Sequence, residues 1–508
     1  AEGNGEKSIV TGNLSLRADL PARTVEQIGN VTQEKTTLAL DDGDTFRLET
    51  LRREVHISPL PLVQFSDKLR YLLHYPYGCI EQTTSAAFPL VYFSDLAKEL
   101  DPELFAKNDP TVFVQEGIRR VATMQMHDGG FAMWPDQDSV APWGSVYATH
   151  FLVEARRAGH HVENFLYDQA LEFVAREGKP SPDANVEALQ RVVYALYVSA
   201  RAGKADIGSM DFVREHHTQQ LKAESRALLG AAYAATGNTQ VLADITKGVE
   251  DIEQITRQTG SNLNSTIRNR ALLLLAFLDA AASDPRVPKL VQRLTRDAQT
   301  DRWWTTQESA LVFVALGQFF KQQAEKKPYS GKVLVGEKII GTFMNKTMTF
   351  SGIQDTGAVT IQMDPGYEAG AAFYAIHSRG VPTDAKFRPE QAGLEIHRTF
   401  MTRTGGPLDV ENIPQGELIV LKTQVKSLAG TLENVVIQNL LPAGVEVENP
   451  RLKSTETLPW VTDANLEPAH LDLRDDRVLL FTDLPDNEWR TTYTLLRAVT
   501  PGTFRLPP

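Results

Sequence analysis

The spacing of apolar and polar positions changes twice along the chain. The first stretch alternates apolar and polar residues as a strand does, and Pro61 ends it. Helical spacing then runs from residue 62 to about residue 323, and strand-like alternation returns after Pro328. A turn signal at Gly380-Val381-Pro382 precedes a last set of strands. The pattern therefore predicts a β-segment, a helical segment, a second β-segment and a separate terminal β-domain.

The helical stretch divides into apolar segments of helix length, separated by turn signals such as Gly129-Gly130. We count about twelve of them, near residues 62–74, 82–99, 111–126, 143–158, 166–176, 185–202, 209–221, 224–236, 239–249, 264–281, 286–299 and 305–323. Twelve helices joined by short turns suit six antiparallel hairpins, which can bury their inner faces by closing into an α/α toroid. An open helical superhelix is the competing arrangement, because such hairpins also stack without closing.

Strand patterns occur on both sides of the helical stretch. Before it lie the alternating apolar residues Ile9, Val10, Leu14, Leu16 and Leu20, followed by residues 37–40 and 46–57. After it lie residues 332–335, 339–343, 348–350, 359–363 and 371–377, and then 394–400, 418–427, 435–440, 470–473, 478–481 and 491–499. Insertions are tolerated where chain ends lie close. We therefore expect residues 1–57 and 326–383 to be two halves of one β-domain, interrupted by a toroid at residues 58–325 and followed by a β-sandwich at residues 384–508.

Composition excludes several function classes. The 508 residues are 42% hydrophobic and 23% charged, which suits roughly three or four globular domains. A net charge of −12 without a Lys/Arg-rich run argues against a nucleic-acid partner. No apolar run approaches the roughly 20 residues that span a bilayer. The histidines at His216-His217 and His127-Asp128 lack metal-site spacing, so we expect exposed side chains there, and we predict no metal and no cofactor.

The only cysteine of the chain lies in a chemically suggestive run, Gly78-Cys79-Ile80-Glu81-Gln82. A cysteine and a glutamine three residues apart at the opening of a helix can bring their side chains together across one turn. The Cys79 sulfur can then attack the Gln82 side-chain carbonyl and expel ammonia, which leaves an internal thioester. We expect Gly78 to allow a tight approach through backbone angles that other residues avoid, and the helix N-terminus to favour the attacking thiolate.

Cys-x-x-Gln alone is a weak signal, but its full context is specific. Residues 75–83, Tyr-Pro-Tyr-Gly-Cys-Ile-Glu-Gln-Thr, resemble the thioester motif of the bacterial branch of the α2-macroglobulin and complement superfamily. Further similar stretches at residues 128–134, 303–310 and 393–398 extend the resemblance over nearly the whole chain. The resemblance implies a multidomain α + β protein in which an α/α toroid is inserted in a CUB-like β-domain and followed by a macroglobulin-like β-sandwich.

The resemblance also implies roles for the neighbours of the thioester. Aromatic side chains shield the bond from water in this family, and Tyr75 and Tyr77 are the nearest candidates. Packing of the turn before the helix is the simpler interpretation of both tyrosines. We expect Glu81 to support local geometry. Complement relatives with hydroxyl preference use a later histidine, but residues 181–189 contain none, so we predict direct attack by lysine amines.

The function that the resemblance implies is single-use trapping of proteases, not catalytic turnover. In the family, a protease cuts a bait region, the molecule rearranges, and the thioester acylates a lysine of that protease. The bait region and the earlier macroglobulin domains have no counterpart here, so we expect a C-terminal fragment. The bacterial branch further implies a periplasmic protein, held at the inner membrane by an N-terminal lipid outside this chain, and a link with a peptidoglycan synthase.

Two other function classes share parts of the pattern. Glycosidases, polysaccharide lyases and terpenoid cyclases also use α/α hairpins, but an enzyme of this kind leaves Cys79 and Gln82 without a task. A binding module with an inert motif is the third class. The mass of the intact protein discriminates them, since a formed thioester lacks one ammonia.

Overall fold

The chain separates into two compact units in a computed structural model, and each unit is described here by itself. One unit comprises residues 24–380, and the other comprises residues 1–23 together with residues 381–508. The structure describes residues 2–3, 6–7, 22–39, 45–59, 61–73, 78–100, 105–106, 109–135, 137–298, 304–322, 329–353, 357–367, 372–383, 391–448 and 458–504.

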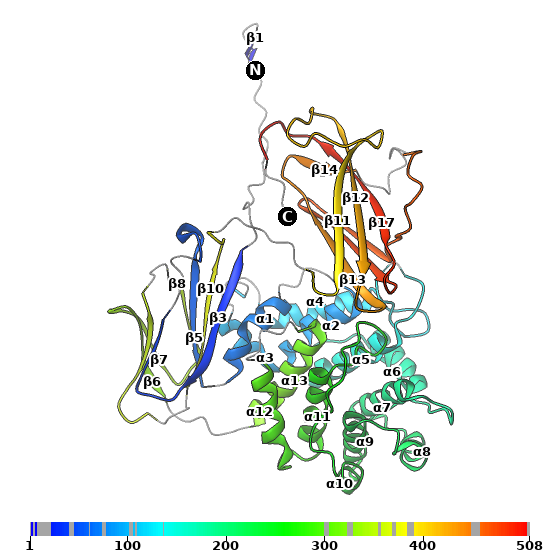
Figure 1. The fold of residues 1–508 in the computed structure, drawn as a ribbon. Helices are drawn as coiled ribbons and strands as arrows, with labels where there is room; N and C mark the ends of the chain where they lie inside the picture. The colour runs from blue at the N-terminus through cyan, green and yellow to red at the C-terminus, as the bar shows by residue number, and fades with distance from the viewer. Residues whose placement is uncertain are drawn as a thin grey trace. The chain divides into compact units, whose positions relative to one another are not determined.

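Helices fill the middle of the first unit, as the apolar spacing predicts (Figure 1). They are α1 Ser66–Leu73, α2 Ile80–Ala87, α3 Leu90–Leu100, α4 Pro110–Ala122, α5 Pro142–Arg157, α6 Asn164–Glu177, α7 Val186–Arg201, α8 Ile207–His217, α9 Ala223–Ala234, α10 Gln240–Ile245, α11 Thr266–Ala280, α12 Arg286–Ala298 and α13 Thr306–Gln322. The prediction of one helix at residues 82–99 is wrong. Two helices, α2 and α3, replace it, because Pro89 between them has no backbone N–H to continue the first one.

The helices close into a ring. Contacts run from α2 to α5, α5 to α7, α7 to α9, α9 to α11 and α11 to α13, and α13 then returns to pack on α2. An open superhelix has no such return contact, so the toroid is the correct arrangement. Burial agrees, because α11 is buried almost all round, from Thr266 to Leu278, as expected of a helix inside a large core.

Two sheets share the first unit with the toroid. One has the strand order β3-β10-β5-β8, formed by Arg23–Val31, Ala372–Gly380, Arg52–Ser58 and Met348–Ile353. The other has the order β4-β9-β6-β7, formed by Lys35–Leu38, Val359–Met363, Ser330–Val335 and Lys338–Met344. Short helices η1 (Leu48–Thr50) and η2 (Pro61–Phe65) flank β5. Strands from before and after the helices thus pair in the same sheets, around a common apolar core that includes Val55, Val333 and Ile361.

The second unit contains a β-sandwich. One layer has the order β11-β12-β17-β14, from Leu394–Thr402, Leu418–Ser427, Arg490–Ala498 and Val445–Val447. The other has the order β13-β16-β15, from Leu432–Leu440, Arg477–Leu484 and His470–Arg474. Leu421, Leu484 and Leu496 are fully buried in its core. A short pairing of β1 (Glu2–Gly3) with β2 (Glu6–Lys7) also belongs to this unit.

After residue 328 the strand prediction misses only the short strand β14 among the described residues, whereas before residue 62 it partly fails. Each strand predicted in residues 332–377 and 394–499 overlaps an observed strand. The run from Ile9 to Leu20 lies outside the described residues. Strand β3 was not predicted, because Arg23–Val31 contains polar residues throughout and its burial does not alternate cleanly. The domain bounds 1–57, 58–325, 326–383 and 384–508 stay a prediction.

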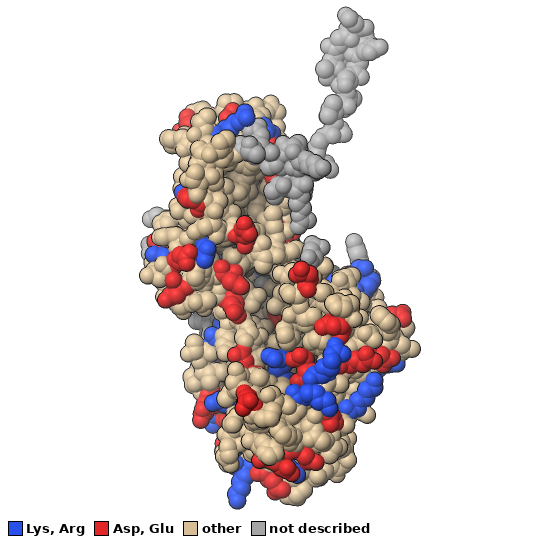
Figure 2. All heavy atoms as spheres, turned by 90° about the vertical axis from the view of Figure 1, so that its right-hand side faces the viewer, with Lys and Arg blue, Asp and Glu red and all other residues tan. Residues whose placement is uncertain are grey.

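Surface charge is mixed on the face shown in Figure 2, where acidic and basic side chains are interspersed in the described part of the surface. In the same described part of the chain, no helix combines the length and apolar character required to cross a membrane.

Candidate functional site

The first turn of α2 brings Cys79 and Gln82 together. Cys79 is the N-cap residue of this helix, and its sulfur accepts a hydrogen bond from the backbone N–H of Gln82 at 3.5 Å. In return, the Gln82 side-chain oxygen accepts from the backbone N–H of Cys79 at 3.3 Å. This reciprocal arrangement is a capping box, which satisfies two backbone donors that have no partner within the helix. Both side chains are therefore held on the same side of the turn.

Burial dominates the chemistry of the Cys79 thiol. Its side chain lies in the interior, with only 5% of the residue exposed. Burial raises the pKa of the thiol well above its usual range, and the negative charge of Glu81 raises it further. Hydrogen bonds from the N–H groups of Gln82 and Glu81 lower the pKa but do not compensate. The helix N-terminus therefore favours the thiolate as expected, but burial outweighs this effect, and the thiol stays protonated in the folded state.

Glu81 connects α2 with the last helix of the ring. Its carboxylate accepts a hydrogen bond from the Ser85 hydroxyl at 2.6 Å, and the Thr306 hydroxyl of α13 lies 2.8 and 3.0 Å from its two oxygens. The Tyr147 hydroxyl is 3.1 Å from that of Ser85, which extends the network to α5. Burial raises the pKa of Glu81, although both hydroxyl donors lower it. Glu81 is thus the buried acceptor that ties three inner helices together.

Gly78 has a different role from the predicted one. Its φ angle is not in the left-handed region, where glycine has its advantage. The Arg120 guanidinium instead donates to the Gly78 carbonyl, from Nη2 at 3.0 Å and from Nε at 3.3 Å. A Cβ atom at residue 78 would lie 2.2 Å from that Nη2. The glycine therefore leaves room for a side chain, not for an unusual backbone angle.

Two of the stretches that carry the family resemblance lie against this site. The Ile80 backbone N–H donates to the carbonyl of Met133 at 2.9 Å, so residues 128–134 hold the start of α2. The stretch at residues 303–310 supplies Thr306, described above. Trp304 of the same stretch is buried, with 3% of the residue exposed, while Trp303 lies outside the described residues. The sequence alone does not indicate these contacts, because both stretches are distant from Cys79 along the chain.

The first turns of the inner helices meet at the same end of the ring as Cys79. Arg268 of α11 donates from Nε to Gln307 of α13 at 3.3 Å, and its guanidinium lies 4.0 Å from the centre of the Trp143 ring of α5. Gln190 of α7 donates to the Glu224 carboxylate of α9 at 2.8 Å. Burial lowers the pKa of Arg268 to about 10. A buried polar layer therefore surrounds the end of the toroid that carries Cys79 and Gln82.

The remaining candidate residues have mixed outcomes. Tyr75 and Tyr77 lie outside the described residues, so shielding stays a prediction. His127 and His216 are exposed, as expected, but His217 is buried at the end of α8, with 3% of the residue exposed, because its ring packs against Phe212. The sequence does not indicate the cluster of Glu54, His56 and His377, because His377 is more than 300 positions from the other two.

Comparisons with known proteins match both units of the chain. The family model of the A-macroglobulin TED domain matches residues 53–181, which include Cys79 and Gln82. The model of the bacterial alpha-2-macroglobulin MG10 domain matches residues 393–508. An alpha-2-macroglobulin of Escherichia coli is 28% identical over 97% of this chain and 31% of its own length. One of Xylella fastidiosa is 25% identical over 100% of this chain and 32% of its own length. The chain thus spans about a third of these curated relatives.

Solved structures agree with the sequence comparisons. A crystal structure of native E. coli alpha-2-macroglobulin, spanning domain MG7 to the C-terminus, has a TM-score of 0.80 at 24% identity, covering 97% of this chain and 79% of that one. A structure of Salmonella alpha-2-macroglobulin reacted with methylamine has a TM-score of 0.81 at 25% identity, covering 96% of this chain and 32% of that one. The toroid, the split β-sheets and the terminal sandwich are therefore an α2-macroglobulin architecture. The chain is thus similar to bacterial α2-macroglobulins in both of its units, and it matches the C-terminal region of the E. coli protein.

Proposed function

We propose that Cys79 and Gln82 form an internal thioester, and that the chain uses it to trap proteases covalently through their lysine amines. The observation that carries the proposal is the reciprocal capping of the two side chains across one helical turn, 3.3 and 3.5 Å between the paired atoms. Thioester formation joins the Cys79 sulfur to the Gln82 side-chain carbon. The amide nitrogen leaves as ammonia and takes the thiol proton with it.

In the attack by an amine, the Cys79 sulfur is the leaving group, whereas the Gln82 nitrogen leaves when the thioester forms. The new bond joins the Gln82 carbonyl carbon to the amine nitrogen, the carbon–sulfur bond breaks, and the sulfur takes up a proton. Burial that raises the pKa of Cys79 makes a thiolate a poor leaving group while the site is closed. Exposure of α2 lowers this barrier, because water stabilises the departing thiolate. The same burial therefore protects the bond at rest and makes release dependent on a conformational change.

The relatives support a protease trap and not an enzyme. They are alpha-2-macroglobulins, and the Salmonella protein has been described after reaction with methylamine, an amine of the kind that acylation requires. Since the chain spans about a third of such relatives, trapping belongs to the longer protein, and this chain supplies the reactive bond. Proteases are then the partners, in the periplasm at the inner membrane, and a peptidoglycan synthase is a further partner consistent with the family resemblance.

Intact-mass measurement tests the proposal directly. Freshly purified chain should be lighter than its sequence mass by one ammonia, and methylamine should then add its full mass once per chain. Cys79→Ser and Gln82→Glu are the matched controls, which should show neither the deficit nor the adduct. A fresh protein at its full sequence mass that also fails to take up methylamine would refute the thioester.

A competition between nucleophiles tests the lysine preference. Methylamine should label the chain much more efficiently than glycerol, because residues 181–189 contain no histidine to assist a hydroxyl. In the longer protein, incubation with a lysine-rich protease should give conjugates that survive denaturation and are absent from Cys79→Ser. Equal labelling by glycerol and methylamine would contradict direct attack by amines.

A further inference from the structure

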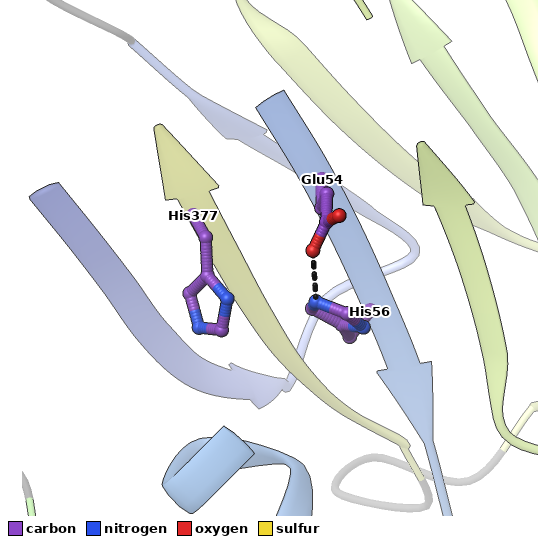
Figure 3. Close-up of side chains that lie close together, drawn as sticks. All are labelled: Glu54, His56 and His377. Atoms are coloured by element: carbon purple, nitrogen blue, oxygen red, sulfur yellow. Dashed lines mark ion pairs between the residues drawn. The ribbon is translucent and has the colours of Figure 1, made fainter. Parts of the chain in front are cut away.

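A second polar cluster lies on the β3-β10-β5-β8 sheet of the first unit and includes none of the thioester residues. Glu54 and His56 come from β5, and His377 comes from the neighbouring strand β10 (Figure 3). Glu54 and His377 are directly paired across the two strands, and His56 follows two residues after Glu54. Cross-strand partners and residues two apart share one face of a sheet. All three side chains therefore lie on the same face.

The potential ligand atoms of these side chains are close together. One atom from each of the three lies within 4.8 Å of the other two. Nε2 of His56 is 3.4 Å from a carboxylate oxygen of Glu54, and the two imidazole rings are 5.0 Å apart between centroids. His56 is fully buried and His377 is 2% exposed, whereas the Glu54 side chain is 24% exposed. The cluster is thus a buried pair of imidazoles that solvent can reach on the side of Glu54.

Outer partners orient both rings from the adjacent strands. The Thr349 hydroxyl on β8 is 2.8 Å from Nδ1 of His56, which leaves Nε2 directed at Glu54. Glu26 on β3 is 3.0 Å from Nε2 of His377. Metal-binding histidines characteristically use their second nitrogen in this way, with a carboxylate or other oxygen that fixes the tautomer and the ring plane. A row of polar side chains across the whole sheet, in the order β3-β10-β5-β8, therefore holds the two rings in place.

We propose that Glu54, His56 and His377 bind a divalent transition-metal ion, and that Zn²⁺ fits this donor set best. Two imidazole nitrogens and one carboxylate oxygen are ligands that Zn²⁺ accepts, with a fourth position left for water or another ligand. The protonation states are suitable. Burial lowers the pKa of His56 to about 4, so its imidazole is neutral at pH 7. Burial raises the pKa of Glu54, but the hydrogen bonds and charges of His56 and Arg70 bring it down to about 2.

The distances require only a small contraction. Zinc–ligand bonds of about 2.0–2.2 Å in a tetrahedron place ligand atoms about 3.3 Å apart. The His56–Glu54 pair is already at 3.4 Å, and the other separations, which reach at most 4.8 Å, close by no more than about 1.5 Å. Arg70 of α1 opposes the ion, since its guanidinium donates to Glu54 at 2.6 Å. Its side chain is 24% exposed, so it can turn towards solvent when the ion arrives.

Metal titration of the full chain, after treatment with a chelator and desalting, tests the proposal. Calorimetric titration should give one Zn²⁺ per chain in the wild type. Glu54→Gln keeps the size of the side chain and removes its charge, and it should weaken Zn²⁺ binding by at least about tenfold. Arg70→Gln removes the competing cation and leaves the three ligands intact. It should bind Zn²⁺ about tenfold more tightly, an effect that a purely structural cluster would not produce.

A second pair in the chain offers a matched control. Glu395 and His397 on β11 repeat the Glu-x-His spacing of β5, and their side chains are 3.1 Å apart. His397 is exposed, however, and no second histidine of the described residues completes a cluster with this pair. Glu395→Gln should leave Zn²⁺ binding unchanged. Wild type that binds no Zn²⁺, or binding that Glu54→Gln and Glu395→Gln alter equally, would overturn the proposal.

Cobalt provides a readout that needs no variant. Co²⁺ in a tetrahedral site absorbs visible light far more strongly than Co²⁺ in water, so the wild-type chain should develop an intense visible spectrum that saturates at one equivalent. A spectrum as weak as that of the aqueous ion would count against the site even if a variant failed to fold.

Discussion

The contact between Glu81 and Thr306 makes a quantitative prediction about how the ring is held closed. Replacing Thr306 by Val keeps the shape of the side chain and removes the hydroxyl that donates to Glu81. Thr306 is not the N-cap of α13, because Thr305 accepts from the backbone N–H of Glu308 at 3.1 Å. The substitution therefore removes one interaction with the carboxylate and leaves the helix start intact.

The size of the effect follows from burial and charge. The Thr306 hydroxyl has one proton, so its positions 2.8 and 3.0 Å from the two oxygens of Glu81 count as one shared hydrogen bond. A hydrogen bond to a charged group contributes about 1.5–3 kcal/mol. Since only 8% of Glu81 is exposed, we expect Thr306→Val to lower the free energy of unfolding by about 2–3 kcal/mol at pH values where Glu81 is ionised.

The cost should depend on pH. Burial already raises the pKa of Glu81 above 4.5, so the folded state holds this proton more tightly than the unfolded state. Stability contributed by the group is therefore present below 4.5 and is lost as the pH rises through the folded-state pKa. Removal of a donor raises that pKa further. Thr306→Val should consequently be mild in acid, where Glu81 is protonated in both proteins, and more severe at alkaline pH.

Urea unfolding, followed by helical circular dichroism at acid and alkaline pH, measures this cost. Thr306→Ser retains the hydroxyl and should behave nearly as the wild type does. In a Glu81→Gln background, the cost of Thr306→Val should shrink and lose its pH dependence, because no buried charge remains to be solvated. Equal costs at both pH values and in both backgrounds would refute the assignment of Glu81 as the buried charge that Thr306 stabilises.

Three further substitutions test other parts of the toroid. The Arg201 guanidinium lies 2.8 Å from Glu154 and 3.0 Å from Asp279, and both carboxylates are buried. Arg201→Leu leaves these charges unpaired and should lower the free energy of unfolding in urea by about 3–5 kcal/mol. Arg201→Lys should lower it less. Burial lowers the pKa of His150 from 6.5 to about 3. Between these pH values, acidification should lower the free energy of unfolding of the wild type by about 1.4 kcal/mol per pH unit relative to that of His150→Phe. If the stability of both proteins changed with pH in parallel, the prediction would be contradicted. A Cβ at Gly117 of α4 would lie 2.5 Å from a side chain of α2. Gly117→Val should therefore lower the free energy of unfolding by about 1–3 kcal/mol, which a thermal melt detects. An unchanged melting temperature would mean that α4 can move aside.

Sequence patterns predicted what depends on local spacing and missed what depends on contacts between distant segments. The helices follow from helical periodicity, whereas their closure into a ring was decided by the contact of α13 with α2. Cys79 with Gln82 follows from a three-residue separation at a helix start. The high pKa of the thiol does not, because it arises from burial by the rest of the fold. The Glu54–His56–His377 cluster was missed for a related reason. His377 reaches the cluster because β10 pairs with β5, and the sequence of β5 alone does not indicate which strand lies beside it.

The order in which the ring closes has a consequence for biosynthesis. Five of the six contacts between inner helices join each inner helix to the next inner helix along the chain. The sixth contact, of α2 with α13, joins the beginning of the toroid to its end, and its residues Glu81 and Thr306 are 225 positions apart. A growing chain cannot make this seam until α13 has left the ribosome. The buried setting of Cys79 and Gln82 is therefore complete only after α13 has emerged, long after the two residues themselves have been made.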